Sequence, residues 1–238
     1  IAIFRILKSE DGYLLLIDKS IVQYFIEKLS MYILMSKVKI QELDEYEVYG
    51  ICGKEAKKIL SGNSMKENQY LQDKNNIVIN NNNKYLSAAI LISKNNVDNN
   101  IEKYIKSCEI LNFNVNELID NLLMLPRITM ETKETHIPQV LNLEELKGIN
   151  YQKGCYTGQE IVARTHYLGK IKKKVFLLSH DNIYLDVGDK IHNSDGEIVG
   201  EVFTSTQKID DACLSIGIIK LDAVANEISS GVTKLNLF

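Results

Sequence analysis

The sequence predicts an α+β fold in which two small α/β modules precede a small C-terminal β unit, either closed or sandwiched. Up to about residue 112, pairs of β-rich apolar runs alternate with segments of helical period. Residues 127–157 show no strong periodicity, and after Gly169 short strand-like runs follow one another at regular spacing. These observations predict four segments: 1–42, 43–112, 113–169 and 170–238.

The first segment, 1–42, resembles the latter part of a ferredoxin-like unit. Its expected elements are strands at Ala2–Leu7 and Tyr13–Ile17 joined by Glu10-Asp11-Gly12, a helix over Ile21–Leu29 capped by Asp18 or Ser20, and a strand at Val38–Gln41. One hairpin and one strand need further partners in an antiparallel sheet. We therefore expect the first module to be truncated, with its other strands before Ile1.

The second module, 43–112, repeats this order. Its expected elements are a strand at Tyr46–Cys52, a helix at Lys54–Leu60, a hairpin of Ile77–Asn80 and Tyr85–Ile92, and a helix at Val97–Ser107. The asparagine run 80–83 is expected in a surface loop, because polar tracts bury little apolar area. Cys52 and Cys108 are expected in the core.

In the third segment, a helix is expected over Val115–Leu125, closed by Pro126. The irregular residues 127–157 suggest function, because long loops without secondary structure are uncommon in compact domains. The strands of the closed or sandwiched C-terminal β unit are expected at Lys174–Leu178, Ile198–Ser205, Leu214–Leu221 and Val232–Phe238, with a tight turn at 193–196.

Composition sets limits on function. The 238 residues are 45% hydrophobic and 25% charged, with a net charge of −3, so the chain has no overall basic character. Its four cysteines form no CxxC pair or Cys/His cluster, which predicts no metal site and a reducing compartment. No apolar run is long enough to span a bilayer, and the first residues do not form a signal peptide.

The residues around Cys155 carry the strongest chemical pattern. Residues 153–160 read K-G-C-Y-T-G-Q-E, in which Thr157 and Glu160 have the spacing of a capping box. A helix is therefore expected from about Gly158 to Gly169, with Ile161, Val162, Thr165 and Leu168 on one face. Cys155 would precede this helix, where the helix dipole and the Lys153 ammonium both favour a thiolate.

Simpler interpretations stay open on these local features alone. Most single cysteines near a helix start are inert, and Glu160 and Arg164 can be only a cap and a surface ion pair. The lysines at 170 and 172–174 can attract phosphate or RNA, or can form a solvated face.

The motif and its flanks resemble the YgfZ family. The matching residues are Ile137-Pro138-Gln139, Leu141-Asn142, Gly148-Ile149, the eight residues 153–160, Val162-Ala163-Arg164, Gly169 and Lys172-Lys173. The resemblance implies the fold of the glycine-cleavage aminomethyltransferase: two α/β modules and a C-terminal barrel around a channel for tetrahydrofolate. It also implies support of iron–sulfur enzymes and of tRNA modification, through Cys155 as the functional thiol.

The resemblance also assigns candidate residues. Folate contacts are expected from Lys153, Tyr156, Gln159, Glu160 and Arg164, with Gly154 and Gly158 shaping the loop. Family members often carry a tryptophan in the helix before Pro126. This chain has none, Asn116 or Phe113 falls near that place, and Met124 stands where a glycine is usual.

Three functions compete. The first is a folate-binding accessory protein, not a conventional enzyme, whose partners are iron–sulfur enzymes or their assembly factors. It is expected to be a monomer in the cytoplasm, with the mitochondrial matrix as the alternative location. Its contact with tRNA is expected to be indirect or weak. The second is an aminomethyltransferase, although the catalytic aspartate of that family is absent. The third is an interaction module that has lost folate binding; a thiol-redox enzyme is less favoured, because no resolving cysteine lies near Cys155.

Overall fold

The computed structural model describes residues 2–9, 12–33, 35–66, 69–72, 76–82, 84, 86–94, 105–111, 113–181, 183–209 and 212–237. The chain divides into two compact units, Ala2–Leu122 and Leu123–Phe238.

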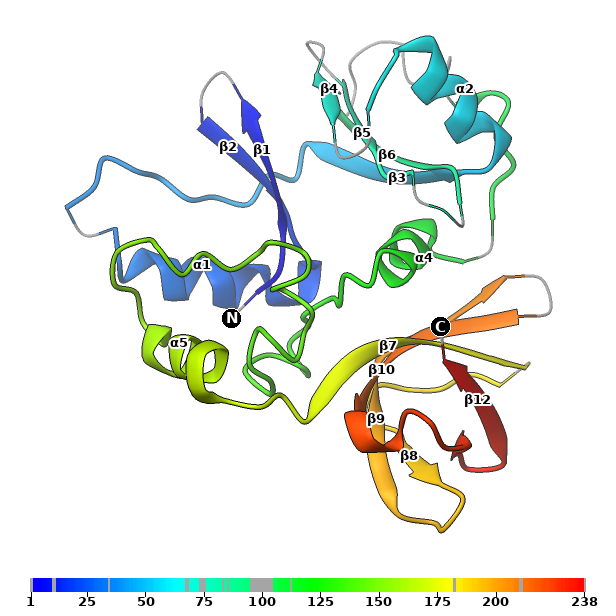
Figure 1. Cartoon of the computed structure of the whole chain (residues 1–238). Coiled ribbons are helices and arrows are strands. Elements are labelled where there is room, and N and C mark those ends of the chain that lie inside the picture. Colours follow the sequence, from blue (N-terminus) through cyan, green and yellow to red (C-terminus); the bar gives the residue numbers. More distant parts are fainter. Residues whose placement is uncertain are drawn as a thin grey trace. The chain divides into compact units, whose positions relative to one another are not determined.

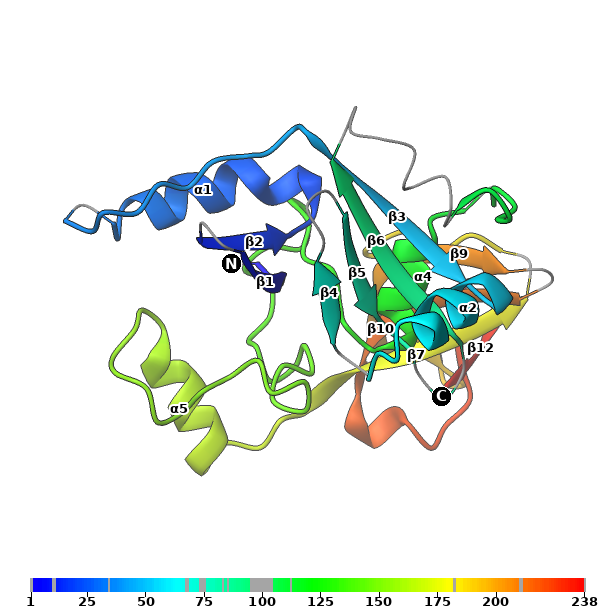
Figure 2. The same ribbon diagram turned by 90° about the horizontal axis from the view of Figure 1, so that it is seen from above.

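The first unit begins with a hairpin and a helix, as the sequence predicts. Strands β1 (Arg5–Ser9) and β2 (Gly12–Leu16) pair antiparallel. The Asp18 side chain accepts a hydrogen bond from the Ser20 amide and caps a 3-10 turn, η1 (Lys19–Ile21), which leads into α1 (Val22–Ser30). Helix α1 lies beside the hairpin (Figures 1 and 2), where Phe25 packs edge-on against Phe4.

A four-stranded antiparallel sheet forms the rest of this unit. Its strands are β3 (Tyr46–Cys52), β4 (Tyr70–Gln72), β5 (Asn76–Asn80) and β6 (Ala88–Lys94), in the order β3-β6-β5-β4 (Figure 2). Helix α2 (Lys54–Gly62) covers one face, where Ile59 and Leu60 meet Ile51 and Leu91. Helix α4 (Val115–Leu122) packs against β3, and the hairpin joins this body through an Arg5–Asp120 ion pair.

The second unit combines an irregular segment, one helix and a closed barrel. Residues 125–158 contain turns but no regular element, and α5 (Gln159–Leu168) follows them. The barrel strands are β7 (Lys173–Asp181), β8 (Lys190–Asn193), β9 (Ile198–Ile209), β10 (Ala212–Lys220), β11 (Ile228–Ser230) and β12 (Thr233–Leu237). They close in the order β10-β7-β12-β11-β8-β9, with a second 3-10 turn, η2 (Leu221–Ala223), between β10 and β11.

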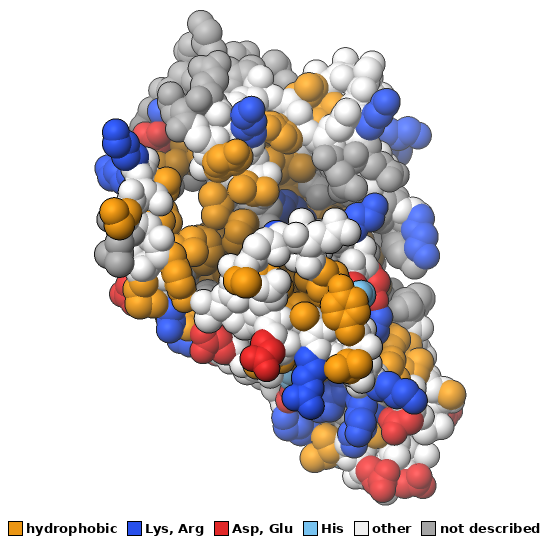
Figure 3. All heavy atoms as spheres, turned by 60° about the vertical axis from the view of Figure 1, so that its left-hand side comes forward, with side chains coloured by type: hydrophobic (Ala, Val, Ile, Leu, Met, Phe, Trp, Pro, Cys, Tyr) orange, Lys and Arg blue, Asp and Glu red, His pale blue; other side chains and the backbone are white. Residues whose placement is uncertain are grey.

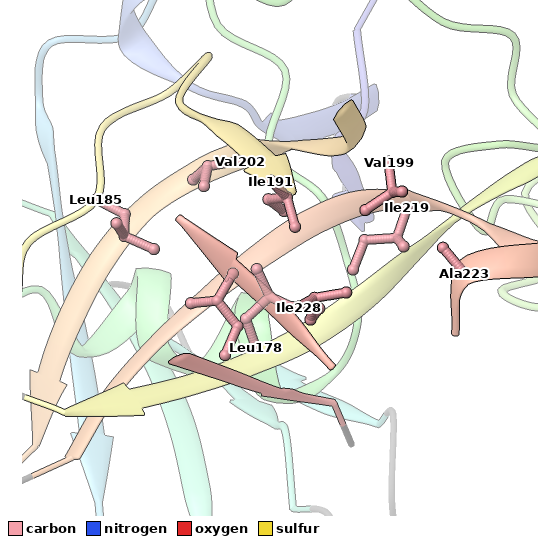
Figure 4. Close-up of a cluster of buried hydrophobic side chains, with 9 residues drawn as sticks. Leu178, Leu185, Ile191, Val199, Val202, Ile219, Ala223 and Ile228 are labelled. Carbon is pink, nitrogen blue, oxygen red and sulfur yellow. The ribbon is translucent and has the colours of Figure 1, made fainter. Parts of the chain in front are cut away.

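The barrel core explains why the sequence predicts this part well. Side chains from all six strands form this core, where they point toward one another (Figure 4), with Leu178, Ile191 and Ile219 almost completely buried. Gly217 leaves room for them, because a Cβ there would lie 2.7 Å from Leu178 Cδ1. The predicted turn at 193–196 is confirmed: Asn193 Oδ1 accepts hydrogen bonds from the amides of Asp195 and Glu197.

Several expectations need correction. Residues 38–41 form no strand, since no described strand pairs with them, and Val38 is exposed. Strands β8 and β11 were not predicted, because each is only three or four residues long. Helix α4 ends at Leu122, three residues before the predicted Leu125. The helix expected at Val97–Ser107 lies mostly outside the described residues; residues 105–107 form a single turn.

The asparagine run was also assigned wrongly to a surface loop. Asn80 ends β5, and Asn80 and Asn81 are both buried. Asn80 Nδ2 donates to the Met65 carbonyl, and Asn80 Oδ1 accepts from the Asn82 amide. Asn82 Oδ1 in turn accepts from the Ala88 amide. The side chains of Asn80 and Asn82 thus replace backbone bonds within the turn, whereas the buried Asn81 Oδ1 has no hydrogen-bond partner among the described residues.

Candidate functional site

Cys155 is exposed on a short loop, residues 150–158, that is folded by its own side chains. At the start of the loop, Asn150 Oδ1 accepts hydrogen bonds from the amides of Gln152, at 2.8 Å, and Lys153, at 3.1 Å. At its end, the Tyr156 amide donates to Gln159 Oε1. The loop therefore has a defined path while its central residues remain open to solvent.

The helix after the loop begins where the sequence predicts, but not by the predicted cap. The N-cap of α5 is Gly158, which has a left-handed φ of 87° and makes no side-chain cap bond. A residue with a Cβ is disfavoured in this conformation, so the backbone requires a glycine here. The capping box of Thr157 and Glu160 is thus wrong as the origin of the cap, and Gln159 supplies the side-chain contact to the loop.

Most of the face of α5 that the sequence predicts is open to solvent. Of the four residues expected to share this face, only Val162 is buried. Ile161 and Leu168 are 61% and 83% exposed. Helix α5 ends before Gly169 as predicted, where the Gly169 amide bonds to the Thr165 carbonyl.

Lys153 and Tyr156, two of the predicted site residues, lie together. The Lys153 ammonium is 4.5 Å from the centroid of the Tyr156 ring, within the range of a cation–π contact. The positive charge is therefore held on the residues that flank Cys155. Activation of the thiol by this charge stays a prediction.

A network that the sequence did not reveal holds the base of the loop. Gln139 is fully buried, and its Nε2 donates to the Val162 carbonyl of α5 at 2.6 Å. The Tyr151 hydroxyl donates to Glu144 Oε1 at 3.1 Å, and His166 Nδ1 lies 2.5 Å from the same oxygen. The Tyr151 and His166 rings stack with centroids 3.9 Å apart.

This network fixes the loop to both the irregular segment and α5. Burial, followed by the hydrogen bond to Glu144, raises the pKa of Tyr151, so its hydroxyl remains a donor at neutral pH. The residues involved are up to 27 positions apart, between 139 and 166, and no periodic pattern connects them. Only Gln139 had a signal in the sequence, as part of the Ile137-Pro138-Gln139 match.

Known proteins have sequences similar to that of this chain. A protein of Vibrio vulnificus strain CMCP6 described as "tRNA-modifying protein YgfZ" is 30% identical over 181 residues, which are 75% of this chain and 54% of that protein. The protein of the same description from Colwellia psychrerythraea is 26% identical over 259 residues, 99% of this chain and 76% of the relative. The chain belongs to the YgfZ family.

Further comparisons identify a solved structure with a similar fold and show how much of the known proteins the chain covers. The aminomethyltransferase T of the Bartonella henselae glycine cleavage system superposes with a TM-score of 0.69, covering 98% of this chain and 69% of that chain, at 11% identity. This likeness confirms the predicted α+β fold with its closed C-terminal barrel. No family model matches the chain. The chain spans about half the length of the Vibrio YgfZ protein.

The other site residues expected from the YgfZ resemblance lie apart from the loop contacts. Glu160 and Arg164 are exposed one turn apart on α5, and neither forms an ion pair with a described residue. Asn116 lies in the other unit, on α4, where its Oδ1 is buried beside Gly50 and has no hydrogen-bond partner among the described residues. The structure thus groups Lys153, Cys155, Tyr156 and Gln159, and leaves Asn116 in a different unit.

The remaining cysteines of this YgfZ chain are much less accessible. Cys213 is completely buried in the barrel. Cys52 and Cys108 are half-buried, and burial raises the pKa of each thiol. The described residues contain no group of three or more His, Cys, Asp or Glu that could hold a metal ion. No helix in the described part of the chain is long and apolar enough to cross a membrane.

Proposed function

We propose that this chain acts in tRNA modification through the thiol of Cys155, as a cytoplasmic accessory protein that also supports iron–sulfur enzymes. The observation that carries the proposal is the exposure of Cys155 on a loop that is held at both ends. The relatives described as tRNA-modifying proteins favour the same assignment.

The geometry suits a thiol that meets a large partner. A macromolecule can approach an exposed loop, whereas the side chains of Cys52, Cys108 and Cys213 are partly or fully covered. The cation beside Tyr156 gives the loop a positive charge that favours an anionic partner or intermediate. Because the loop is already ordered by Asn150 and Tyr151, little conformational entropy is lost on contact.

Tetrahydrofolate is part of the proposal as a ligand of the family fold, in which it would supply a carrier of one-carbon units. Within this chain, Lys153, Tyr156, Gln159, Glu160 and Arg164 are the proposed contacts in the second unit. Asn116 offers an unsatisfied acceptor in the first unit, but its Oδ1 is covered by Gly50. We also propose that the α/β part of this chain consists of two ferredoxin-like modules.

Genetic complementation tests the role of the thiol. In a bacterial strain that lacks its own YgfZ, Cys155→Ala should abolish the rescue of tRNA modification, and Cys155→Ser should do the same because a hydroxyl is a far weaker nucleophile. Cys108→Ala is the matched control and should retain rescue. Full rescue by Cys155→Ala would remove the thiol from the mechanism.

Thiol labelling separates accessibility from function. At neutral pH, iodoacetamide should alkylate Cys155 at least about tenfold faster than Cys52 or Cys108, since burial raises the pKa of both of these thiols. Mass spectrometry of tryptic peptides gives the rate at each position. Equal rates at all three positions would contradict an accessible, reactive Cys155.

An interaction module without folate is the second candidate, and the covered acceptor of Asn116 favours it. Calorimetry with tetrahydrofolate distinguishes the two. Binding that is weakened by Lys153→Ala supports the folate-linked function. No binding to this chain or to a longer form of it would leave only the interaction module.

A further inference from the structure

Residues 144–174 are basic in a chain that is acidic overall. They contain seven of the 28 Lys and Arg residues but only three of the 31 Asp and Glu residues. The rest of the chain therefore has a clear excess of carboxylates. A local excess of cations on one segment creates an anion-binding field that the net charge of −3 conceals.

Internal ion pairs use only part of this charge. Lys174 pairs with Glu145. The hydrogen bond from Lys190 is the main cause that lowers the pKa of Glu201, and the charge of Lys173 adds a smaller effect in the same direction. By contrast, Lys147, Lys170 and Lys172 are exposed and form no ion pair with any described residue. Among the three acids, Glu144 is occupied by Tyr151 and His166, so only Glu160 is free to oppose these lysines.

Aromatic and apolar side chains lie on the same helix. Tyr167 is 68% exposed, and its ring meets the edge of His166, with centroids 4.8 Å apart. His166 in turn stacks on the half-buried Tyr151, whose hydroxyl is hydrogen-bonded to Glu144, so a fixed ring supports the outer one. Leu168 follows Tyr167 and is also exposed.

Space-filling atoms show the same mixture of side chains. Figure 3 brings forward the side of the molecule that carries α5, and in its lower half Lys and Arg side chains gather beside hydrophobic ones. Solvated charge alone would not need an exposed tyrosine on a fixed aromatic support. The combination of unpaired cations and an open ring is typical of surfaces that bind unpaired nucleotides.

We propose that an unpaired segment of RNA binds this surface, defined by Lys147, Tyr167, Leu168, Lys170 and Lys172. A base would stack on the Tyr167 ring, and the lysines would contact neighbouring phosphates. Duplex RNA fits less well, because its bases are already stacked and paired. The inference rests on the proposed function, which makes tRNA the source of that RNA. It assigns a direct contact between this surface and tRNA, whereas the net charge of the chain predicts a weak or indirect contact.

Fluorescence anisotropy with a labelled single-stranded RNA of about 12 nucleotides tests the proposal on the 238-residue chain. Tyr167→Ala should weaken binding about fivefold or more, because the stacked base loses its platform. Lys170→Ala/Lys172→Ala should weaken binding and reduce the slope of log affinity against log salt by roughly 1.4, about 0.7 per lost phosphate contact.

Matched variants keep the test specific. Tyr184 belongs to the same unit, is also 68% exposed, and lies between Asp181 and Asp186 in sequence, so Tyr184→Ala should bind RNA as the wild type does. Lys37→Ala/Lys39→Ala removes two exposed lysines elsewhere and should leave the salt slope unchanged. Equal losses in the matched and the surface variants would overturn the proposal, as would undiminished binding by Tyr167→Ala.

Two further measurements complete the design. Poly-glutamate that competes as strongly as RNA would overturn the proposal, because the surface would then fit an acidic protein. Cys155→Ala should bind RNA normally, which separates this surface from the proposed thiol function. If Cys155→Ala still rescued tRNA modification while Tyr167→Ala lost RNA binding, the thiol proposal would fail and the RNA surface would remain.

Discussion

The barrel and the Cys155 loop belong to the same unit but are held together in opposite ways. In the barrel, six strands share backbone hydrogen bonds around an apolar core, so each side chain supplies a small part of the stability. The loop has no regular backbone pairing, and a few polar side chains, chiefly Asn150, Tyr151 and Gln139, determine its path. We therefore expect barrel substitutions to act globally and loop substitutions to act locally.

The largest effect should come from Gly200→Ala in the barrel. A Cβ at Gly200 would lie 2.5 Å from the Ile218 carbonyl oxygen, and this backbone atom cannot rotate away. We expect a loss of about 3 kcal/mol in the free energy of unfolding, at the upper end of the effect of overpacking. Urea denaturation followed by circular dichroism measures it.

Gly62→Ala provides the control for that substitution. No atom lies within 4 Å of a Cβ at Gly62, in the last turn of α2, so alanine should be neutral or slightly stabilising there. If Gly200→Ala proved as stable as Gly62→Ala, the strands β9 and β10 could not be as close as the structure places them.

Tyr151 is the strongest test of local control. Tyr151→Phe keeps the stack on His166 but loses the hydrogen bond to Glu144, and should lower stability by about 1 kcal/mol. Tyr151→Leu loses both contacts and should lower stability by about 2 kcal/mol. Hydrogen exchange should rise in residues 150–168 and remain slow in β7 and β10. Uniformly faster exchange in the barrel would show that the two regions unfold together.

Protonation of a histidine in the barrel should have an intermediate effect on the free energy of unfolding. Burial lowers the pKa of His180, while Asp181 acts more weakly in the opposite direction. The ring is 1% exposed, and its hydrogen-bond partner among the described residues is Ser215 Oγ, at Nε2. Because the unfolded state binds the proton more readily, stability should be constant above about pH 6.5 and should decline as the pH falls toward the lower, folded pKa.

A double variant isolates that contribution. His180→Leu/Ser215→Ala removes the titrating ring together with its hydroxyl partner, so the stability lost by acidification from pH 8 to pH 5 should be smaller than in the wild type. His136, whose pKa is also lowered by burial, remains in both proteins and cancels in the comparison. An unchanged pH dependence would mean that His180 is solvated or already charged in the folded state.

The same contrast explains which features the sequence could predict. Alternation and turn residues such as Asn193 to Gly196 are local, so they indicated the long barrel strands and the two hairpins. Strand β8 has only four residues; it pairs with β9 across the turn at 193–196, but its other partner, β11, is reached only through barrel closure, which a local pattern cannot encode. The burial of Asn80 and Asn81 was missed because it depends on hydrogen bonds to residues elsewhere in the fold: Asn80 Nδ2 donates to the Met65 carbonyl, and the Asn81 amide donates to the Ala88 carbonyl.

Within the site, the motif predicted the position of the Cys155 loop but not the side chains that hold the base of this loop. The position of Cys155 before a helix followed from residues 153–160 alone. Glu144 and His166 gave no signal, since their meeting depends on how the irregular segment folds back onto α5. The exposed face of α5 was also missed, because periodicity shows that apolar residues share a face but not that another surface covers it.

Substitution of Asn150 should have the smallest effect on stability and should report most directly on the structure of the loop. Its side chain accepts hydrogen bonds from the amides of Gln152 and Lys153. Asn150→Ala removes this acceptor at an exposed site, so the free energy of unfolding should fall by only about 0.5 kcal/mol. The amides of residues 152 and 153 should nevertheless exchange faster. Asn150→Asp retains an acceptor oxygen and should restore their protection, whereas equal exchange in the alanine and aspartate variants would mean that the backbone holds the Cys155 loop without this side chain.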